Sequence, residues 1–139
     1  MRPRICWMVC VVALLLFPSL QAQGPKWAKT YEGTYSYAQD AASPVPFTMD
    51  LQVNGISVWG RTSEPATFGD GTSAYLYANI SGTISGLNIS FVKTYDGTGG
   101  QRHSVQYQGT FSSDRSSMSG TWQLGSSNGS FSAFAKLGQ

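Results

Sequence analysis

Apolar and polar side chains alternate with a period of two along most of the chain from Tyr31 to Leu137. In a β-strand, successive side chains point to opposite faces, so this alternation places one face in a core and the other in solvent. Clusters of Gly, Ser, Asn and Asp interrupt the alternation at short intervals, as turns do. No long segment has apolar residues at helical spacing. We therefore expect an all-β protein.

The alternation predicts about eight strands of about seven residues each. They cover Tyr31–Tyr37, Phe47–Val53, Ile56–Thr62, Ala74–Ser81, Leu87–Thr94, Val105–Phe111, Met118–Leu124 and Phe131–Leu137. Asn54–Gly55 is a typical hairpin turn, and Glu64–Ser73 (EPATFGDGTS) is expected to be a loop. The inward face of the fourth strand stays open. Tyr75 and Tyr77 lie on one face, and the apolar residues Leu76, Ala78 and Ile80 lie on the other.

Two architectures suit so many short strands. Hairpin-linked antiparallel strands close most simply into an up-and-down barrel, which leaves no strand edge exposed. A two-sheet sandwich of immunoglobulin type needs long crossover connections, and only Glu64–Ser73 is long enough to be one. We favour a single-domain, antiparallel up-and-down eight-stranded barrel over residues 23–139.

The first 22 residues are typical of a secretory signal peptide. Arg2 and Arg4 precede the apolar run Trp7–Phe17, Pro18 ends the run, and Ala22 offers a small residue for cleavage. The run is shorter than the roughly 20 residues that a membrane-spanning helix needs. We expect a secreted protein, extracellular or, in a bacterium, periplasmic, with no membrane attachment after cleavage.

Loss of this segment changes the charge and removes every cysteine. The chain has 9 basic and 7 acidic residues, and Arg2 and Arg4 leave with the segment, so the remaining domain is formally neutral. No basic run that could follow a phosphate backbone exists, so we expect no nucleic-acid binding. Cys6 and Cys10 also lie in the segment, so a folded domain without disulfides is expected.

The residues needed for common catalytic sites are scarce. His103 is the only histidine, and it follows a glycine-rich turn, where we expect an exposed position. A Ser–His–Asp arrangement would have to use it with Asp96 or Asp114. Metal sites of zinc or iron normally need several histidines or thiolates. We expect no enzyme, no metal and no cofactor, although a carboxylate pair of the glycosidase type stays open among Glu32, Asp50 and Glu64.

The aromatic residues are the more informative set. An eight-stranded barrel is just wide enough either to be filled by side chains or to hold one small molecule. Buried tyrosine and tryptophan need partners for their O–H and N–H groups, which also suits a ligand. Large and small inward residues are mixed, so both outcomes stay open. The residues that we expect to line a ligand site are Tyr35, Trp59, Phe91, Tyr107 and Trp122.

Three stretches resemble the avidin/streptavidin family of calycin-type barrels in strand order and spacing. They are FTMDLQVNGISVWGRT (Phe47–Thr62), ISFVKTYDG with HSVQYQGTF (Ile89–Phe111) and MSGTW (Met118–Trp122). The resemblance implies a secreted eight-stranded barrel that binds biotin in its open end. It covers most of the chain after residue 22 as a pattern of glycines, aromatics and turns.

The resemblance carries over to few individual residues. Trp122 falls where the family has a binding tryptophan, Tyr107 stands where the family usually has tryptophan, and Phe91 lies near another such place. Tyr35 and Ser36 occupy the strand that supplies polar groups to the ureido oxygen. The late acidic residue that contacts a ureido nitrogen has no counterpart in Gly129–Lys136. We therefore do not expect biotin as the ligand.

Three Asn-x-Ser triplets begin at Asn79, Asn88 and Asn128. Asn88 belongs to the polar face of its strand and Asn128 to a turn, so we expect these two to be glycosylated if the host is a eukaryote.

We expect a non-enzymatic barrel that binds a small, partly apolar ligand in its open end. The alternative is a filled barrel that acts as an interaction or inhibitor module, using Glu64–Ser73 or the DGTGGQRH turn against a protein partner. A homo-oligomer also stays open.

Overall fold

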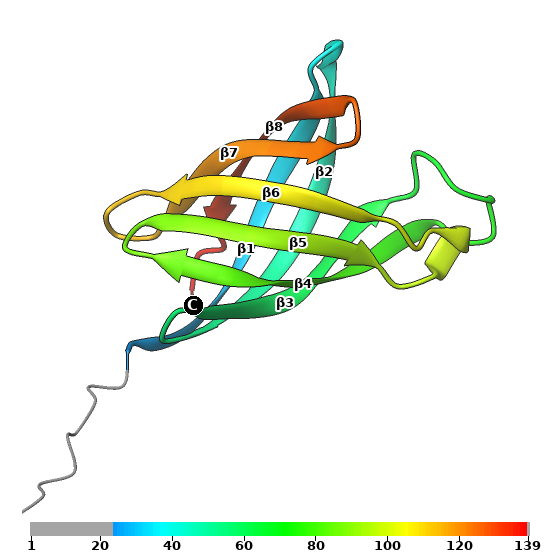
Figure 1. Cartoon of the computed structure of the whole chain (residues 1–139). Coiled ribbons are helices and arrows are strands. Elements are labelled where there is room, and N and C mark those ends of the chain that lie inside the picture. The colour runs from blue at the N-terminus through cyan, green and yellow to red at the C-terminus, as the bar shows by residue number, and fades with distance from the viewer. Residues whose placement is uncertain (1–23, 139) are drawn as a thin grey trace, which may run out of the picture.

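The computed structural model describes residues 24–138, so the predicted signal peptide and both cysteines lie outside the described residues. Eight antiparallel strands form one closed barrel in which each strand pairs with the next and β8 pairs with β1 (Figure 1). Their bounds are β1 (Lys26–Tyr37), β2 (Asp40–Asn54), β3 (Ser57–Pro65), β4 (Tyr75–Ser85), β5 (Asn88–Tyr95), β6 (Ser104–Phe111), β7 (Ser117–Leu124) and β8 (Ser127–Ala135). One short 3-10 turn, η1 (Thr98–Gly100), precedes β6. The predicted up-and-down barrel is confirmed, and the sandwich is wrong.

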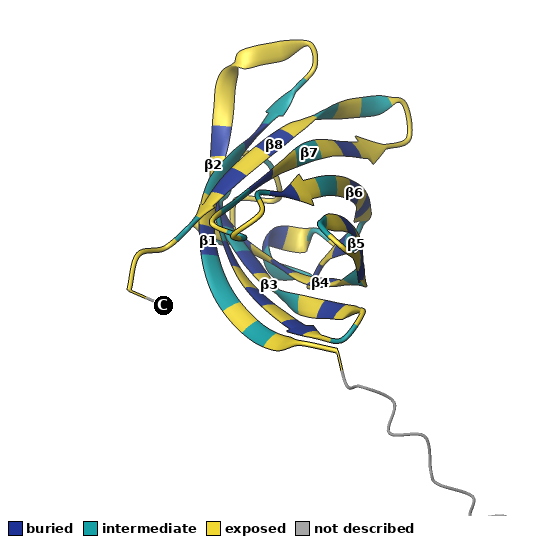
Figure 2. Ribbon diagram, turned by 90° about the vertical axis from the view of Figure 1, so that its left-hand side faces the viewer, coloured by how far each residue is buried: buried dark blue, intermediate teal, exposed yellow. Residues whose placement is uncertain are grey.

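Buried and exposed residues alternate along β4, β5 and β6 and along the second part of β2, as the sequence pattern predicts (Figure 2). In β4 the inward residues are Leu76, Ala78 and Ile80, whereas Tyr75 and Tyr77 are exposed on the outer wall. This facing lets the two tyrosine hydroxyls meet water while the aliphatic side chains enter the core. No helix among residues 24–138 is long and apolar enough to span a membrane.

The first three strands are longer than the sequence predicts, and β1 begins at Lys26 instead of Tyr31. β2 begins at Asp40, and its first residues are exposed. β3 continues to Pro65, so the prediction that Glu64 begins a loop is wrong. Because Val58, Thr62 and Glu64 share the inward face of β3, the strand carries a carboxylate into the barrel.

A stacked pair of side chains closes the end of the barrel where β1 begins. The guanidinium of Arg115 lies 5.4 Å from the Trp27 ring centroid, and the Trp27 ring meets Phe111 edge to face at 5.7 Å. The Tyr31 hydroxyl donates a hydrogen bond of 2.7 Å to the carbonyl oxygen of Arg115. Burial raises the pKa of Tyr31 to about 12, so this donor keeps its proton. We call this arrangement the closed end.

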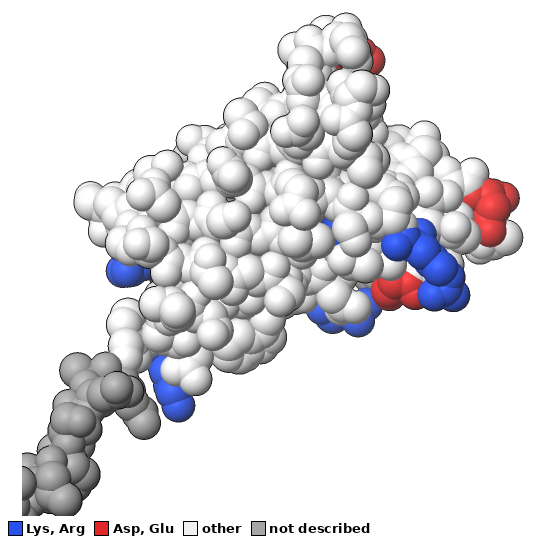
Figure 3. All heavy atoms as spheres, in the orientation of Figure 1, with Lys and Arg blue, Asp and Glu red and all other residues white. Residues whose placement is uncertain are grey.

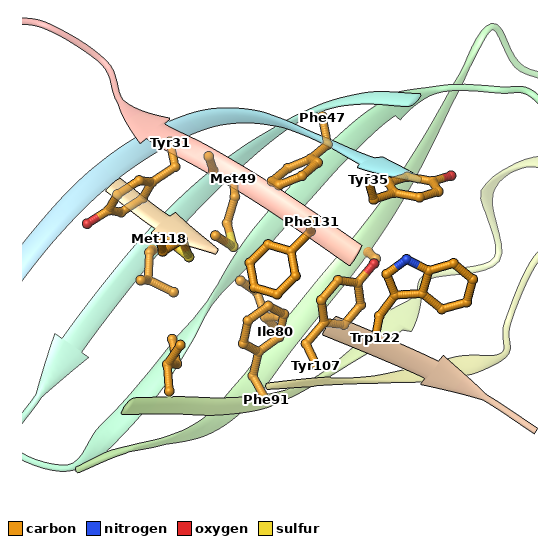
Figure 4. Packing of buried hydrophobic residues seen from close by; sticks show 14 of the residues in the cluster. Tyr31, Tyr35, Phe47, Met49, Ile80, Phe91, Tyr107, Met118, Trp122 and Phe131 are labelled. Atoms are coloured by element: carbon orange, nitrogen blue, oxygen red, sulfur yellow. The ribbon is translucent and has the colours of Figure 1, made fainter. Parts of the chain in front are cut away.

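Aromatic and sulfur-containing side chains fill the middle of the barrel (Figure 4). Phe131 on β8 packs at its centre, with ring centroids 6.3 Å from Phe91 and 5.3 Å from Tyr107. Met49 and Met118 are fully buried in the same cluster. A disulfide-free domain of this size depends on such a core for its stability.

The two longest connections meet at the other end of the barrel. The backbone N–H of Asp70, in the β3–β4 loop, donates to the carbonyl oxygen of Gly99 in η1. Asp70 and Asp96 each accept hydrogen bonds from the N–H and O–H of the residue two positions on, Thr72 and Thr98. These bonds lower the pKa of both carboxyl groups, so the two turns are held by ionised aspartates.

The inward facing of β8 can be tested with two phenylalanines on opposite faces of the strand. Phe131→Ala should lower the free energy of unfolding by about 3–5 kcal/mol, because it leaves a cavity among rings. Phe134→Ala, at a position that is 67% exposed, should change that free energy by less than about 0.5 kcal/mol. Urea unfolding followed by circular dichroism measures both, and equal losses would contradict the register of β8.

Candidate functional site

A buried ion pair lies inside the barrel between β3 and β5. Glu64 is 1% exposed and Lys93 is 3% exposed. The Lys93 ammonium donates to Oε1 of Glu64. The same oxygen accepts the Tyr95 hydroxyl at 2.9 Å, and Oε2 accepts the Tyr35 hydroxyl at 2.6 Å. Both carboxylate oxygens are therefore hydrogen-bonded within the protein.

The tyrosine rings also stabilise the cation. The Lys93 ammonium lies 4.7 Å from the ring centroid of Tyr95 and 5.3 Å from that of Tyr35. Burial lowers the pKa of Lys93, and the charge of Glu64 opposes this effect. Burial and the Glu64 charge raise the pKa of Tyr35 and of Tyr95, so both hydroxyls remain protonated donors. We call Glu64, Lys93, Tyr35 and Tyr95 the polar cluster.

The polar cluster divides the interior of the barrel. On the side of the closed end, the space next to Lys93 is about 10 Å³, lined by Thr62, Phe91 and neighbouring core residues, and holds at most about one water molecule. On the other side a pocket of about 270 Å³ opens to solvent. We call it the cup. It is lined by Tyr35, Tyr37, Phe68, Tyr95, His103, Val105, Tyr107, Trp122, Leu124 and Ser127.

Two groups of rings meet edge to face in the wall of the cup. On β1 and β7, the Trp122 ring meets Tyr37 at 5.1 Å and 85° and Tyr35 at 6.3 Å and 86°. In the second group, Phe68 from the β3–β4 loop meets Tyr95 at 5.7 Å and 83°. His103 packs 4.7 Å from Tyr95. Such contacts add to the energy of simple burial and hold the wall in shape.

The Trp122 ring is fixed by a hydrogen bond across β8. Its indole N–H donates to the carbonyl oxygen of Ser36 on β1 at 3.2 Å. Gly129 lies between them on β8, and a Cβ atom there would come within 2.6 Å of Trp122 Nε1 and 1.8 Å of the Ser36 oxygen. Only glycine therefore lets the tryptophan reach its acceptor.

Three of the five predicted ligand-site residues line the cup, namely Tyr35, Tyr107 and Trp122. Phe91 lies beneath the cup, where it stacks on Tyr107. Trp59 lies on the outer wall of β3, opposite Gln52 and Ser81, and is 42% exposed.

Other predicted positions can also be placed. The expectation of an exposed His103 is wrong, because the segment after η1 turns inward and half-buries its ring against Phe68 and Tyr95. Asn88 and Asn128 are exposed, so glycans attached there would project away from the barrel interior. The prediction that Asn128 lies in a turn is wrong, because it belongs to β8 and pairs with Gln123 on β7.

The sequence analysis did not predict the polar cluster, although the alternation indicates the inward position of two of its residues. Lys93 and Tyr95 continue the inward face that starts with Ile89 and Phe91. A lysine on an apolar face is a signal for a buried partner, because an unpaired buried charge is costly. Glu64 was hidden by Pro65 and the glycines that follow, which resemble a loop.

Some hollows of the molecule are larger than the cup, and two of them have volumes of about 470 Å³ each. One runs over the outer wall of β4–β7 between serine, threonine and glutamine side chains, and the other flanks the closed end beside Trp27 and Arg115. The hollow beside the closed end reaches the inward residues Val53 and Ile84, whereas the cup, although smaller, is lined mostly by rings and includes Tyr35 and Tyr95 of the polar cluster.

Residues 24–138 contain no group of three or more His, Cys, Asp or Glu side chains that could hold a metal ion. Within the same part of the chain, His103 contacts aromatic rings and makes no side-chain hydrogen bond to a serine or an aspartate. Comparison of the chain with protein-family models, with curated proteins and with solved structures gives no match. The relationship to the avidin/streptavidin family therefore stays a prediction.

The coupling within the ion pair can be measured by a double-mutant cycle. Lys93→Met should lower the free energy of unfolding by about 3–5 kcal/mol, because it leaves the Glu64 charge buried without a partner. Glu64→Gln should also destabilise, since the Lys93 charge is then unpaired. The double variant should lose much less than the sum of the two, because no charge remains and the introduced amide oxygen still accepts a tyrosine hydroxyl.

The matched control is the exposed pair Lys136–Glu32, whose charged atoms are 3.9 Å apart. Lys136→Met should leave urea unfolding almost unchanged. Additive losses in the Glu64 and Lys93 variants would contradict a coupled buried pair.

Proposed function

We propose that this protein is a secreted, non-enzymatic binding protein that holds a small, partly apolar ligand in the cup. The observation that carries the proposal is an apolar pocket of about 270 Å³ at one end of a barrel whose middle is filled by core side chains. Pockets for small molecules usually start at about 300 Å³ and combine apolar walls with a few placed polar groups. The cup lies close to this lower limit, so the ligand is small.

The size of the cup supports ligand binding over the alternative of a filled barrel that acts through its loops. A filled interior would leave spaces well below the volume of a small-molecule site. The β3–β4 loop and the η1 segment, which that alternative needs as free contact elements, bond to each other. They also supply Phe68 and His103 to the cup wall.

The outer wall supports the absence of a nucleic-acid partner. β6 and β7 expose serine, threonine and glutamine side chains, and the face seen in Figure 3 shows few charged atoms over the strands. Phosphate backbones are bound by clustered lysine and arginine. Secretion is proposed on the features of the first 22 residues.

A relationship to avidin and streptavidin is part of the proposal only at the level of a barrel with a ligand in its open end. The acidic residue inside this barrel is Glu64 on β3, and both of its oxygens are engaged by the polar cluster. Glu64 is 1% exposed and does not line the cup, so its carboxylate is out of reach of a ureido N–H group. Biotin is therefore not the ligand that we propose.

Native mass spectrometry of the protein purified from its own host tests the proposal. We expect a defined small mass that stays with the folded protein and is released on unfolding. Recovery of the bare protein in complex with another protein would favour the interaction module instead.

Blocking the mouth of the cup should remove the bound mass. Leu124 is 38% exposed at the rim, so Leu124→Trp is expected to fold normally while its larger ring occupies the opening. The control is Ile56→Trp, which adds a ring at an exposed site on the other end. Retention of the same mass by the Leu124 variant would count against the cup.

A further inference from the structure

Three hydroxyls in the cup, those of Tyr37, Tyr107 and Ser127, make no hydrogen bond within residues 24–138, and of these three only Tyr107 is a buried residue. Tyr107 is 6% exposed and lines both the cup and the small space beneath it. Tyr35 and Tyr95 donate to Glu64, and Trp122 donates to Ser36. Among residues 24–138 the Tyr107 hydroxyl makes no hydrogen bond. The fully buried polar atoms that lack a partner lie elsewhere, at Trp27, Thr62 and Arg115, so the Tyr107 hydroxyl meets solvent in the cup, where the acceptor of a ligand can reach it.

The Tyr107 ring is held in place before any ligand binds. It stacks on Phe91 with a centroid distance of 4.8 Å and an interplanar angle of 7°, and it meets Phe131 edge to face. Tyr107 lies opposite Trp122 on the neighbouring strand, and both residues are labelled in Figure 4. A donor whose ring is already fixed loses little conformational entropy on binding.

The hydroxyl also keeps its proton. Burial, with a smaller contribution from the Glu64 charge, raises the pKa of Tyr107. It therefore offers a neutral O–H donor at physiological pH.

The walls of the cup restrict the charge and shape of the ligand. None of the ten lining residues is a lysine, arginine, aspartate or glutamate. A charged ligand would lose water there without gaining a counter-charge, which is costly. Seven of the ten carry aromatic or imidazole rings, and a flat ring makes the largest contact with such walls.

We propose that the cup binds a flat, uncharged ring compound with a hydrogen-bond acceptor, a ring nitrogen or a carbonyl oxygen, which the Tyr107 hydroxyl engages. This inference rests on the proposed function and adds the chemical class of the ligand and the residue that orients it. Tyr35 and Tyr95 do not take this role, because their hydroxyls already donate hydrogen bonds to Glu64 in the polar cluster.

Three ring compounds of nearly the same shape test the need for a hydrogen-bond acceptor and the effect of a charge separately. Quinoline has a ring nitrogen that accepts a hydrogen bond, naphthalene has none, and N-methylquinolinium carries a positive charge. Each is titrated into ¹⁵N-labelled protein while the indole N–H resonances are followed. Trp122 reports on the cup, Trp27 on the closed end and Trp59 on the outer wall.

We expect quinoline to shift the Trp122 resonance and to bind about 3–10-fold more tightly than naphthalene, the range for one neutral hydrogen bond. N-methylquinolinium should bind more weakly than either. Tyr107→Phe keeps the ring stack and should lower the affinity for quinoline to that for naphthalene. The control Tyr31→Phe, which loses a hydroxyl at the closed end, should change neither affinity.

Equal affinities for quinoline and naphthalene, unchanged by Tyr107→Phe, would overturn the role of Tyr107 while leaving a ligand-binding cup. Preference for the cationic probe, or shifts at Trp27 without any at Trp122, would overturn the proposed ligand class. The proposed function is judged separately by the mass retained in the protein from its own host, so the two can fail independently.

Discussion

The buried ion pair of Glu64 and Lys93 is the interaction around which the interior of the barrel is arranged. Two charges removed from water are stabilised only when their geometry and remaining hydrogen bonds are satisfied. Tyr35 and Tyr95 meet this need with two O–H donors to the carboxylate and two ring faces toward the ammonium. The cluster therefore joins β1, β3 and β5 across the lumen.

This cluster gives the two ends of the barrel different properties. On one side, Phe91, Phe131 and the methionines fill the space, and Arg115 over Trp27 covers the end. On the other side, the tyrosines that hold the ion pair form the floor of the cup. A polar cluster in mid-lumen thus keeps the pocket shallow, and ring-bearing residues around it supply an apolar wall. We propose that shape and apolar surface hold a small molecule there, and that the hydroxyl of the buried Tyr107 orients it.

The alternation of side chains was sufficient to predict the fold, because a period of two assigns each strand its inward face and short turns leave a barrel as the simplest closure. It also placed Tyr35, Tyr107 and Trp122 inside, and the structure brings these three into one pocket. Continuing the same alternation from Phe91 by two further inward positions would have placed Lys93 and Tyr95 inside as well.

The ion pair, the end of β3 and the inward position of His103 depend on contacts between residues that are distant in the sequence. Glu64 and Lys93 are 29 residues apart, and no local pattern links them. Pro65 made the end of β3 resemble a loop, and the turn before His103 gave no sign that its ring packs inward. Whether the lumen is filled depends on how side chains of different strands share its volume, which alternation does not specify.

The division of the lumen by the ion pair can be located with a heavy-atom probe. Crystals soaked in iodobenzene would reveal, by anomalous scattering, where a small apolar ring enters the barrel. We predict an iodine peak among Tyr35, Tyr107 and Trp122 and none between Met49 and Met118. A peak in the middle of the barrel, or a cup occupied by protein side chains with no iodine, would contradict the division that we describe.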